Sequence, residues 1–302
     1  EQENFTRARA LFMEVLSIAN KQTLINKRLK VRALVKLADI AGQTQHYEES
    51  KGLLEEALAI LEKVPEQKLT FAQTKVYLAT IYMTQGNLEE SDELLNEALA
   101  IMNSLKECKT SDSIEIKIQI ALVYWNSYQL EKAESILKTV IAEAESTKDC
   151  EKLLGESLGV LGGVYTHQKR YSEAESLLNR ALAVNFKLFG TGHATLGSCY
   201  FKLGECYRME NKFEESKAAY NNALTIIEKR YGKNSVMGAR VFLGLAEIAQ
   251  KEKDYQNAAR LFQSSISILE TKAAQNREEL IEELIAYEKI LGELKRSQEA
   301  IA

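Results

Sequence analysis

The sequence predicts an all-α solenoid of antiparallel helix hairpins, and three observations carry that prediction. A unit of about 42 residues recurs along the 302-residue chain. Within each unit, apolar residues recur at helical spacing in two stretches that a polar turn separates. One proline in the whole chain is typical of long uninterrupted helices. Because neither helix of a unit can bury its apolar face alone, the units must stack into an array.

The repeat is clearest at 161–184, where Tyr171 opens the second helix after a polar turn at 166–170. Equivalents of Tyr171 recur at intervals of 41 or 42 residues, as Tyr47, Leu88, Leu130, Tyr171, Phe213 and Tyr255. Nine positions before each stands a small residue: Ala38, Ala79, Ala121, Gly162, Gly204 and Ala246. Three positions after each stands another: Ser50, Ser91, Ala133, Ala174, Ser216 and Ala258. Paired small residues let the two helices of a unit approach closely.

These residues carry a family resemblance. Tyr200-x2-Leu203-Gly204-x2-Tyr207, followed by Ser216-x3-Tyr220 and Ala223, resembles the tetratricopeptide pattern W-x2-L-G-x2-Y…A-x3-F. The period is similar to the 42-residue variant of kinesin light chains, and the match covers roughly residues 30 to 270. The resemblance implies a right-handed superhelical solenoid whose first helices line a concave groove.

We expect a single solenoid over residues 1–302, with each element following from the register. The expected elements are a half repeat at 4–20, full repeats at about 27–63, 68–104, 113–145, 152–189, 194–231 and 236–271, and a C-terminal capping helix at 277–296. Pro65 ends the first full repeat, and Gly190 and Gly232 are suited to helix C-caps. The half repeat leaves two alternatives, an absent N-terminal part or an array that opens with an unpaired helix. The last helix either covers the final apolar surface or belongs to a longer chain.

Composition narrows the classes of partner and compartment. A net charge of −4 and a pI near 5.7 disfavour nucleic acid, and no apolar run is long enough for membrane insertion. Cys108 and Cys150 lie one repeat apart, too far for an unstrained disulfide, and Cys206 falls on a core position. We expect the cytoplasm or another reducing compartment, with organellar import by a removed presequence left open.

Motifs of catalysis and metal binding are not found in the sequence. His46, His167 and His193 fall in turns on separate units. The glycine-rich stretch 155–163 follows no strand, so tight helix packing explains it better than a phosphate loop. We therefore expect no enzyme activity, no cofactor and no metal.

First-helix positions that the register leaves off the core are the candidate partner-binding residues. They are Arg32, Asp39, Gln43, Gln73, Thr80, Met83, Thr84, Glu115, Leu122, Trp125, Asn126, Glu156, Gly159, Gly163, Thr166, His167, Ser198, Glu205, Arg208, Arg240, Glu247, Gln250 and Lys251. Val35, Ile118 and Leu243 share these registers but are better explained as helix contacts.

Within this set we expect an apolar pocket across the second to fourth units. The only tryptophan, Trp125, is placed beside Leu122 and Met83, and exposed aromatics often anchor interfaces. Gly159 and Gly163 would deepen the floor. The expected rim residues are Glu115, Asn126, Glu156 and His167. The alternative is that Trp125 packs into its own helix turn or a neighbouring unit.

The predicted function is a non-catalytic adaptor that binds a protein or peptide in the groove. Mixed charges in the groove predict a partner of mixed charge with an apolar anchor. One alternative is a regulatory sensor whose superhelix changes shape on binding a small peptide or metabolite, and another is a non-catalytic targeting subunit of an enzyme complex. The carboxylate-clamp residues of the family do not carry over, because Val35 and Asp39 stand where Lys and Asn would be needed. The oligomeric state is left open.

Overall fold

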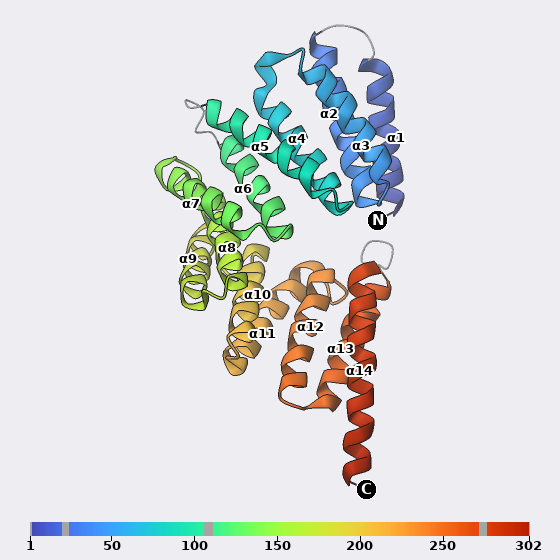
Figure 1. Ribbon diagram of the computed structural model, residues 1–302, viewed down its shortest axis with the longest axis vertical. Helices are drawn as coiled ribbons and strands as arrows, with labels where there is room; N and C mark the ends of the chain where they lie inside the picture. The colour runs from blue at the N-terminus through green and yellow to red at the C-terminus, as the bar shows by residue number, and fades with distance from the viewer. Residues whose placement is uncertain (1, 20–23, 106–110, 272–276, 302) are drawn as a thin grey trace. The chain divides into compact units, whose positions relative to one another are not determined.

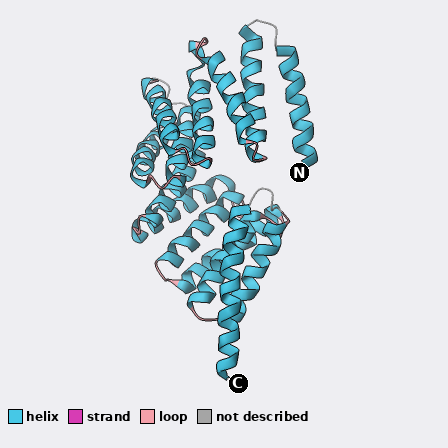
Figure 2. Cartoon of the chain, turned by 45° about the vertical axis from the view of Figure 1, so that its right-hand side comes forward, coloured by secondary structure: helices cyan, strands magenta, loops and turns pink. Residues whose placement is uncertain are grey.

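The described part of the chain folds into helices joined by short loops (Figure 2). A computed structural model describes residues 2–19, 24–105, 111–271 and 277–301. The helices are α1 (Gln2–Ala19), α2 (Leu24–Gln43), α3 (Tyr47–Leu61), η1 (Pro65–Gln67), α4 (Lys68–Thr84), α5 (Leu88–Ser104), α6 (Ser111–Asn126), α7 (Leu130–Ser146), α8 (Glu151–His167), α9 (Tyr171–Phe189), α10 (Ala194–Met209), α11 (Phe213–Tyr231), α12 (Val236–Lys251), α13 (Tyr255–Glu270) and α14 (Arg277–Ile301). The predicted all-α class is confirmed.

The six residues expected to open second helices are the first residues of α3, α5, α7, α9, α11 and α13. Acidic residues occupy the first turn of most of these helices, including Glu48 and Glu49 in α3 and Glu214 and Glu215 in α11. Carboxylates there interact favourably with the helix dipole. The repeat register therefore locates the start of each second helix.

A left-handed residue closes the turn of every hairpin. Gln45, Gly86, Tyr128, Lys169, Asn211 and Lys253 all have positive φ, between 59° and 81°. In the fourth hairpin, the Arg170 N–H donates to the Tyr165 carbonyl at 2.9 Å, and the Lys169 N–H donates to the Thr166 carbonyl at 3.0 Å. The same two bonds recur in the other five turns. This is the Schellman arrangement, which satisfies the last carbonyls of each first helix.

The paired small residues bring the helices of each hairpin together. Ser50 donates its hydroxyl to the Ala38 carbonyl at 2.8 Å, and Ser216 donates to the Gly204 carbonyl at 2.6 Å. A Cβ on Gly204 would lie 2.5 Å from the Tyr220 ring. The hairpins therefore need a small residue at these positions for steric reasons.

Helices pack in two layers along the repeats. Within residues 1–147 and within residues 148–302, consecutive first helices contact each other, as α2 with α4 and α8 with α10. Each second helix packs on its own first helix and, in most hairpins, on the next one. Consecutive helices run in opposite directions (Figure 1). In each of these two stretches the first helices therefore form a layer of their own, and the outward surface of that layer is called the first-helix face below.

The chain divides into two compact units, Glu1–Thr147 and Lys148–Ala302. The single solenoid over residues 1–302 stays a prediction. The two units are described separately below.

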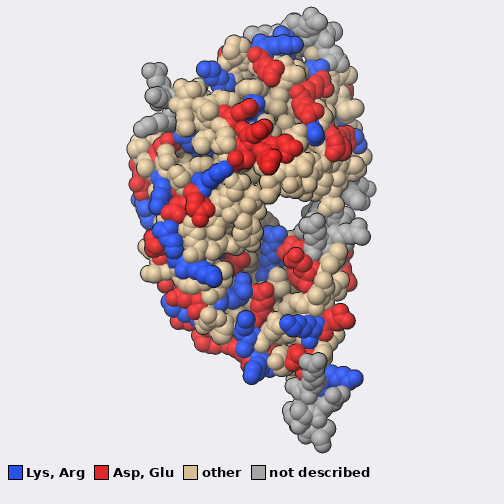
Figure 3. Space-filling model, in the orientation of Figure 1, with Lys and Arg blue, Asp and Glu red and all other residues tan. Residues whose placement is uncertain are grey.

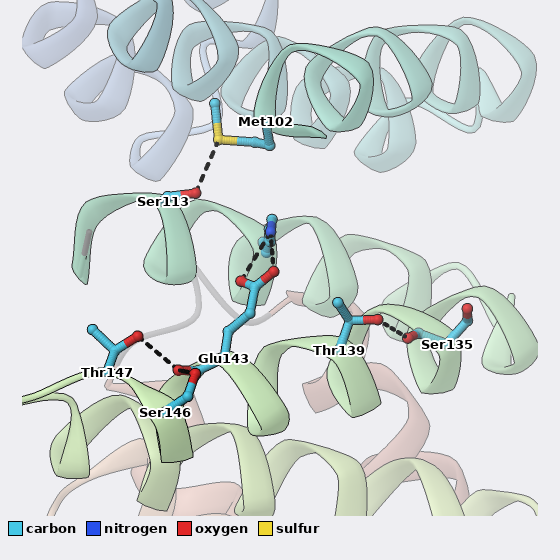
Figure 4. A network of polar contacts seen from close by, with 8 residues as sticks. Met102, Ser113, Ser135, Thr139, Glu143, Ser146 and Thr147 are labelled. Carbon is cyan, nitrogen blue, oxygen red and sulfur yellow. Dashed lines mark hydrogen bonds and ion pairs between the residues drawn. The ribbon is translucent and has the colours of Figure 1, made fainter. Parts of the chain in front are cut away.

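The third hairpin shows how polar groups join the two layers of the first unit. Lys117 on α6 is buried, and its Nζ lies 2.7 Å and 2.9 Å from the two carboxylate oxygens of Glu143 on α7 (Figure 4). At the same hairpin, Ser113 Oγ lies 3.9 Å from the sulfur of Met102 on α5. The ion pair therefore joins α7 to α6.

The last helix of the second unit covers the apolar surface of α13. Ile290 of α14 is fully buried in a cluster with Phe262 and Ile266, and Leu280 and Tyr287 pack against it. Ile281 and Ile285 lie on another side of α14 and are exposed. Among the cysteines, Cys206 is fully buried as expected, and Cys150 and Cys199 are buried free thiols, while Cys108 lies outside the described residues.

Candidate functional site

The predicted site residues all lie on the first helices α2, α4, α6, α8, α10 and α12, but their exposure differs. Exposed side chains are those of Arg32, Asp39, Gln43, Thr84, Glu115, Asn126, Glu156, Arg240 and Lys251. Half-buried ones are those of Gln73, Thr80, Met83, Leu122, Trp125, His167, Ser198, Glu205, Arg208, Glu247 and Gln250. Gly159, Gly163 and Thr166 are buried. Val35 and Leu243 pack against core clusters and Ile118 is buried, as expected for helix contacts.

The first unit contains a pocket of about 250 Å³ between α2, α3 and α4, called the α2–α4 pocket below. It is lined by Ala38, Asp39, Gly42, Gln43, Tyr47, Ser50, Leu54, Tyr77, Thr80, Ile81 and Thr84. Four of these, Asp39, Gln43, Thr80 and Thr84, are predicted site residues. The structure thus brings candidates from the first two repeats together around one cavity.

Small residues leave room for this pocket. Ala38 and Gly42 lie one helical turn apart on α2, and Ser50 faces them from α3. A Cβ on Gly42 would lie 3.3 Å from Ile81 Cδ1 and 3.6 Å from Ser50 Oγ. Larger side chains at these positions would fill the space between the three helices.

Polar groups at the pocket are paired with one another. Gln43 donates its amide to Asp39 Oδ1 at 2.9 Å, and Gln73 donates its amide to the Tyr77 hydroxyl at 3.1 Å. Burial raises the pKa of Tyr77 above its ordinary value, and the carboxylates of Asp39 and Glu115 raise it further. The phenol at this pocket therefore experiences a negative potential.

Tyr47, Leu54 and Tyr77 line the pocket but are not among the predicted site residues. Their side chains contribute to the core cluster around Ala38 and Leu78. One signal in the sequence could have located the pocket, namely two small residues one turn apart on a first helix, Ala38 and Gly42.

In the second unit, ion pairs run across the first-helix face. Arg208 Nη1 on α10 lies 2.7 Å from Glu247 Oε2 on α12, and Arg240 Nε donates to Glu279 on α14 at 2.9 Å. Burial raises the pKa of Glu205, although neighbouring Arg208 opposes the shift. The predicted mixture of charges thus forms pairs between successive helices.

Glu283 of α14 has the least solvent-exposed carboxyl group among the described residues. It is 2% exposed, and Ser265 Oγ lies 3.0 Å from its Oε1. The same hydroxyl lies 2.8 Å from the Ala239 carbonyl and has only one proton to donate. Burial raises the pKa of Glu283 to about 7, and the carboxylates of Glu279 and Glu247 act in the same direction. A protonated Glu283 could donate to Ser265 and leave the serine to donate to the carbonyl.

The predicted pocket around Trp125 has residues in both compact units. Trp125, Leu122 and Met83 lie in the first unit, whereas Gly159, Gly163 and His167 lie in the second. A Cβ on Gly159 would have no atom within 4 Å, which leaves open space at that point of α8. Thr166 donates its hydroxyl to the Gly162 carbonyl at 2.9 Å, so it points into the helix rather than to a ligand. The pocket around Trp125 stays a prediction.

Burial lowers the pKa of His167, with Arg208 as the second cause, so its imidazole favours the neutral form. Within the described ranges, no group of three or more His, Cys, Asp or Glu residues could hold a metal ion. Nor is any helix there long and apolar enough to cross a bilayer.

Comparison with protein families decides the classification. Models described as tetratricopeptide repeat match residues 71–105, 153–224 and 203–271, together about half of the chain. The chain belongs to the tetratricopeptide repeat family. The predicted resemblance is confirmed, and the chain is a helical repeat scaffold of the kind that supports protein interaction.

Solved structures of tetratricopeptide arrays share this fold. BtubC (BKLC) from P. vanneervenii is 18% identical, with a TM-score of 0.59 over 76% of this chain and 91% of that one. The tetratricopeptide-like repeats of a putative kinesin light chain from Podosopora anserina are 22% identical, with a TM-score of 0.56 over 68% and 97%. The Rap conjugation gene regulator of plasmid pLS20, solved with the Phr* peptide, is 15% identical, with a TM-score of 0.58 over 90% and 72%. No curated protein matches the chain.

Proposed function

We propose that this tetratricopeptide chain is a non-catalytic adaptor that binds a protein or peptide on its first-helix face. The observation that carries the proposal is the α2–α4 pocket, where predicted first-helix residues surround an apolar cavity with a polar rim. Concave apolar sites with a few placed polar groups are typical of ligand binding. The pairing of charges in the second unit favours a partner of mixed charge rather than a strongly acidic or basic one.

A second candidate function is a regulatory sensor whose helices rearrange when a small peptide binds. The likeness to a Rap regulator solved with a peptide favours this candidate, although that likeness extends only to the fold. Small-angle scattering of the chain with and without its captured partner would separate the two. If the scattering shows that the chain itself changes shape when the partner binds, the sensor is supported. If the partner only adds mass and the chain keeps its shape, the adaptor is supported. A third candidate function is a non-catalytic targeting subunit of an enzyme complex. Co-purification of a catalytic partner with the chain would support it.

Photo-crosslinking from defined positions tests the adaptor proposal. A benzoylphenylalanine is placed at Gln43 or Thr84 on the first-helix face, and at Glu55 or Phe186, which are exposed on the second helices α3 and α9. Each chain is irradiated in lysate of the source cells, and adducts are identified by mass spectrometry.

The adaptor proposal predicts one protein that forms adducts from Gln43 and Thr84 but not from Glu55 and Phe186. Adducts of the same protein from the second-helix positions alone would move the binding surface to the other layer. Equal labelling from all four positions would mean non-specific association, and the proposal would be abandoned.

A further inference from the structure

We propose that the α2–α4 pocket holds one large apolar side chain of the partner, beside a cationic residue that pairs with Asp39. This inference rests on the proposed function and specifies the chemistry of the bound segment. The matching ligand is a short peptide motif in which Phe, Leu or a residue of similar size lies next to Arg or Lys. The size of the pocket, the state of its polar groups and the charge at its mouth each support part of this motif.

The volume fits a single side chain. Pockets for drug-sized molecules span roughly 300–1,000 Å³, and the α2–α4 pocket has about 250 Å³. Its floor is formed by Ala38, Leu54 and Ile81, all of which are buried side chains of the core. A large apolar group inserted here would displace water from an already apolar surface.

The serine and threonine hydroxyls of the walls already donate their protons to backbone carbonyls. Ser50 donates to the Ala38 carbonyl at 2.8 Å, Thr80 to the Val76 carbonyl at 2.9 Å, and Thr84 to the Ile81 carbonyl at 2.8 Å. A ligand carbonyl or carboxylate placed inside would lose its bonds to water without gaining these donors. The part of the wall formed by Ser50, Thr80 and Thr84 therefore favours a side chain without polar atoms, and the phenols of Tyr47 and Tyr77 are the other hydroxyl groups in the lining.

The charge at the mouth selects the neighbouring residue. Asp39 is the one acidic or basic residue in the pocket lining. Its Oδ2 lies 3.9 Å from Lys36 Nζ, a long pair between side chains that are 44% and 57% exposed, and such surface pairs hold a carboxylate weakly.

Acidic residues outside the pocket lining also make the electrostatic potential at the pocket more negative. Asp39 and Glu115 both disfavour ionisation of Tyr77, which places negative potential at the pocket. Residues 1–147 carry 22 acidic and 17 basic residues, a net charge of −5. Acidic side chains gather in the upper part of Figure 3, where α3 and α5 lie. A cation beside the apolar anchor would be attracted, and an anion repelled.

Four synthetic peptides test the motif directly. Each is a capped nonapeptide of Gly and Ser with a central pair, which is Phe-Arg, Phe-Glu, Ala-Arg or Ala-Glu. The peptides are titrated to about 5 mM into the full chain labelled at Ile, Leu and Ala methyl groups, and methyl spectra are recorded. The motif predicts saturable shifts of the Ile81, Leu54 and Ala38 methyls with Phe-Arg, and affinities at least about fivefold weaker for the other three.

Two variants and a matched control locate the contact. Asp39→Asn, an exposed change on the rim, should weaken Phe-Arg binding about fivefold while leaving Phe-Glu binding no weaker. Thr80→Phe should fill the pocket and abolish the Ile81 shift, with a thermal melt as the check on folding. Glu55→Gln removes an exposed carboxylate on α3 outside the pocket and should change nothing.

Two results would overturn the inference: Ile81 and Leu54 methyls that do not shift with any peptide, or Phe-Glu binding as tightly as Phe-Arg. The proposed function fails separately. If the photo-crosslinked partner binds wild type and Thr80→Phe equally well, the first-helix face still binds a protein, and only the pocket assignment is lost.

Discussion

At the scale of the residue, Gly204 of α10 illustrates how one missing methyl group shapes a hairpin. The Tyr220 ring on α11 occupies the space where a Cβ would lie, at 2.5 Å from the nearest ring carbon, and this tyrosine is 1% exposed. The ring also covers Gly244 of the next first helix, where a Cβ would lie 2.5 Å from Tyr220 Cζ. One buried tyrosine thus determines the small residues on two successive first helices.

We expect Gly204→Ala to lower the free energy of unfolding by about 2 kcal/mol, because the rigid ring must move in a packed core. Gly159→Ala on α8 is the matched control, since a Cβ there meets no atom within 4 Å. This control should be neutral or more stable by up to about 1 kcal/mol, owing to the helix propensity of alanine. Urea denaturation of both variants measures the difference. A neutral Gly204→Ala would mean that α10 and α11 separate easily.

Glu283 makes the stability of the second unit depend on pH. Its pKa is raised from 4.5 to about 7 in the folded protein, so the folded state binds the proton more tightly than the unfolded state does. The contribution of Glu283 to the free energy of unfolding is fully present below about pH 4.5 and is lost as the pH rises towards 7. Glu283→Gln should therefore match wild type near pH 4.5 and exceed its stability by about 2 kcal/mol at pH 8.

Denaturant titrations at the two pH values measure this effect, with Glu288→Gln as the control on the exposed side of α14. The control should show no such pH-dependent gain. If Glu283→Gln were destabilising at both pH values, Glu283 would be ionised in the folded protein and its charge would be compensated by Arg240.

At the scale of the element, the hairpin turns and the ion pairs between helices determine how each unit holds together. The Lys117–Glu143 pair is the clearest case, because the two side chains are only 9% and 20% exposed. Removing one partner of a buried pair leaves an uncompensated charge, whereas replacing both by apolar residues is often neutral.

We expect Glu143→Ala to destabilise the first unit by about 3 kcal/mol, and Lys117→Met with Glu143→Leu to restore most of that loss. Thermal unfolding of the single and double variants measures both values. The exposed pair Arg28–Glu66 of the first unit, whose side chains are 55% and 45% exposed, gives the comparison, since Arg28→Ala should change the stability little. Equal losses for the single and double changes would show that the pair contributes through packing rather than through charge.

The sequence predicts where most of the helices begin and how they pair, but it predicts less of the candidate binding site. The recurrence of Tyr171 equivalents locates the start of every second helix. This is possible because the spacing of apolar and small residues gives both the repeat length and the buried face of each helix. The left-handed turn residue escapes such reasoning, since Gln45, Tyr128 and Lys169 share no side-chain chemistry and are fixed by hairpin geometry. The raised pKa of Glu283 likewise depends on how α14 packs against α13, which a repeat pattern cannot specify. For the α2–α4 pocket, the register found the rim residue Asp39 but missed the wall residue Tyr77.

At the scale of the whole molecule, the chain comprises two compact units that are built from the same helix-hairpin repeat but differ in net charge. The first unit has a net charge of −5 and contains the α2–α4 pocket. Residues 148–302 carry 22 basic and 21 acidic residues, and ion pairs such as Arg208–Glu247 lie on their first-helix face. In the proposed adaptor, the first unit accepts an apolar anchor and a cationic residue of the partner, whereas the second unit offers balanced polar contacts.

The most direct test of the adaptor account is the affinity of the photo-crosslinked partner for wild type and for Trp125→Ala. Trp125 is half-buried on α6, and Phe186→Ala on α9 removes an exposed aromatic from a second helix as the control. Calorimetric titration should show that Trp125→Ala weakens binding by about 2 kcal/mol with little change in melting temperature, while Phe186→Ala binds as wild type does. Unchanged affinity together with a large fall in melting temperature would assign Trp125 to the core and contradict its role as an anchor on the first-helix face.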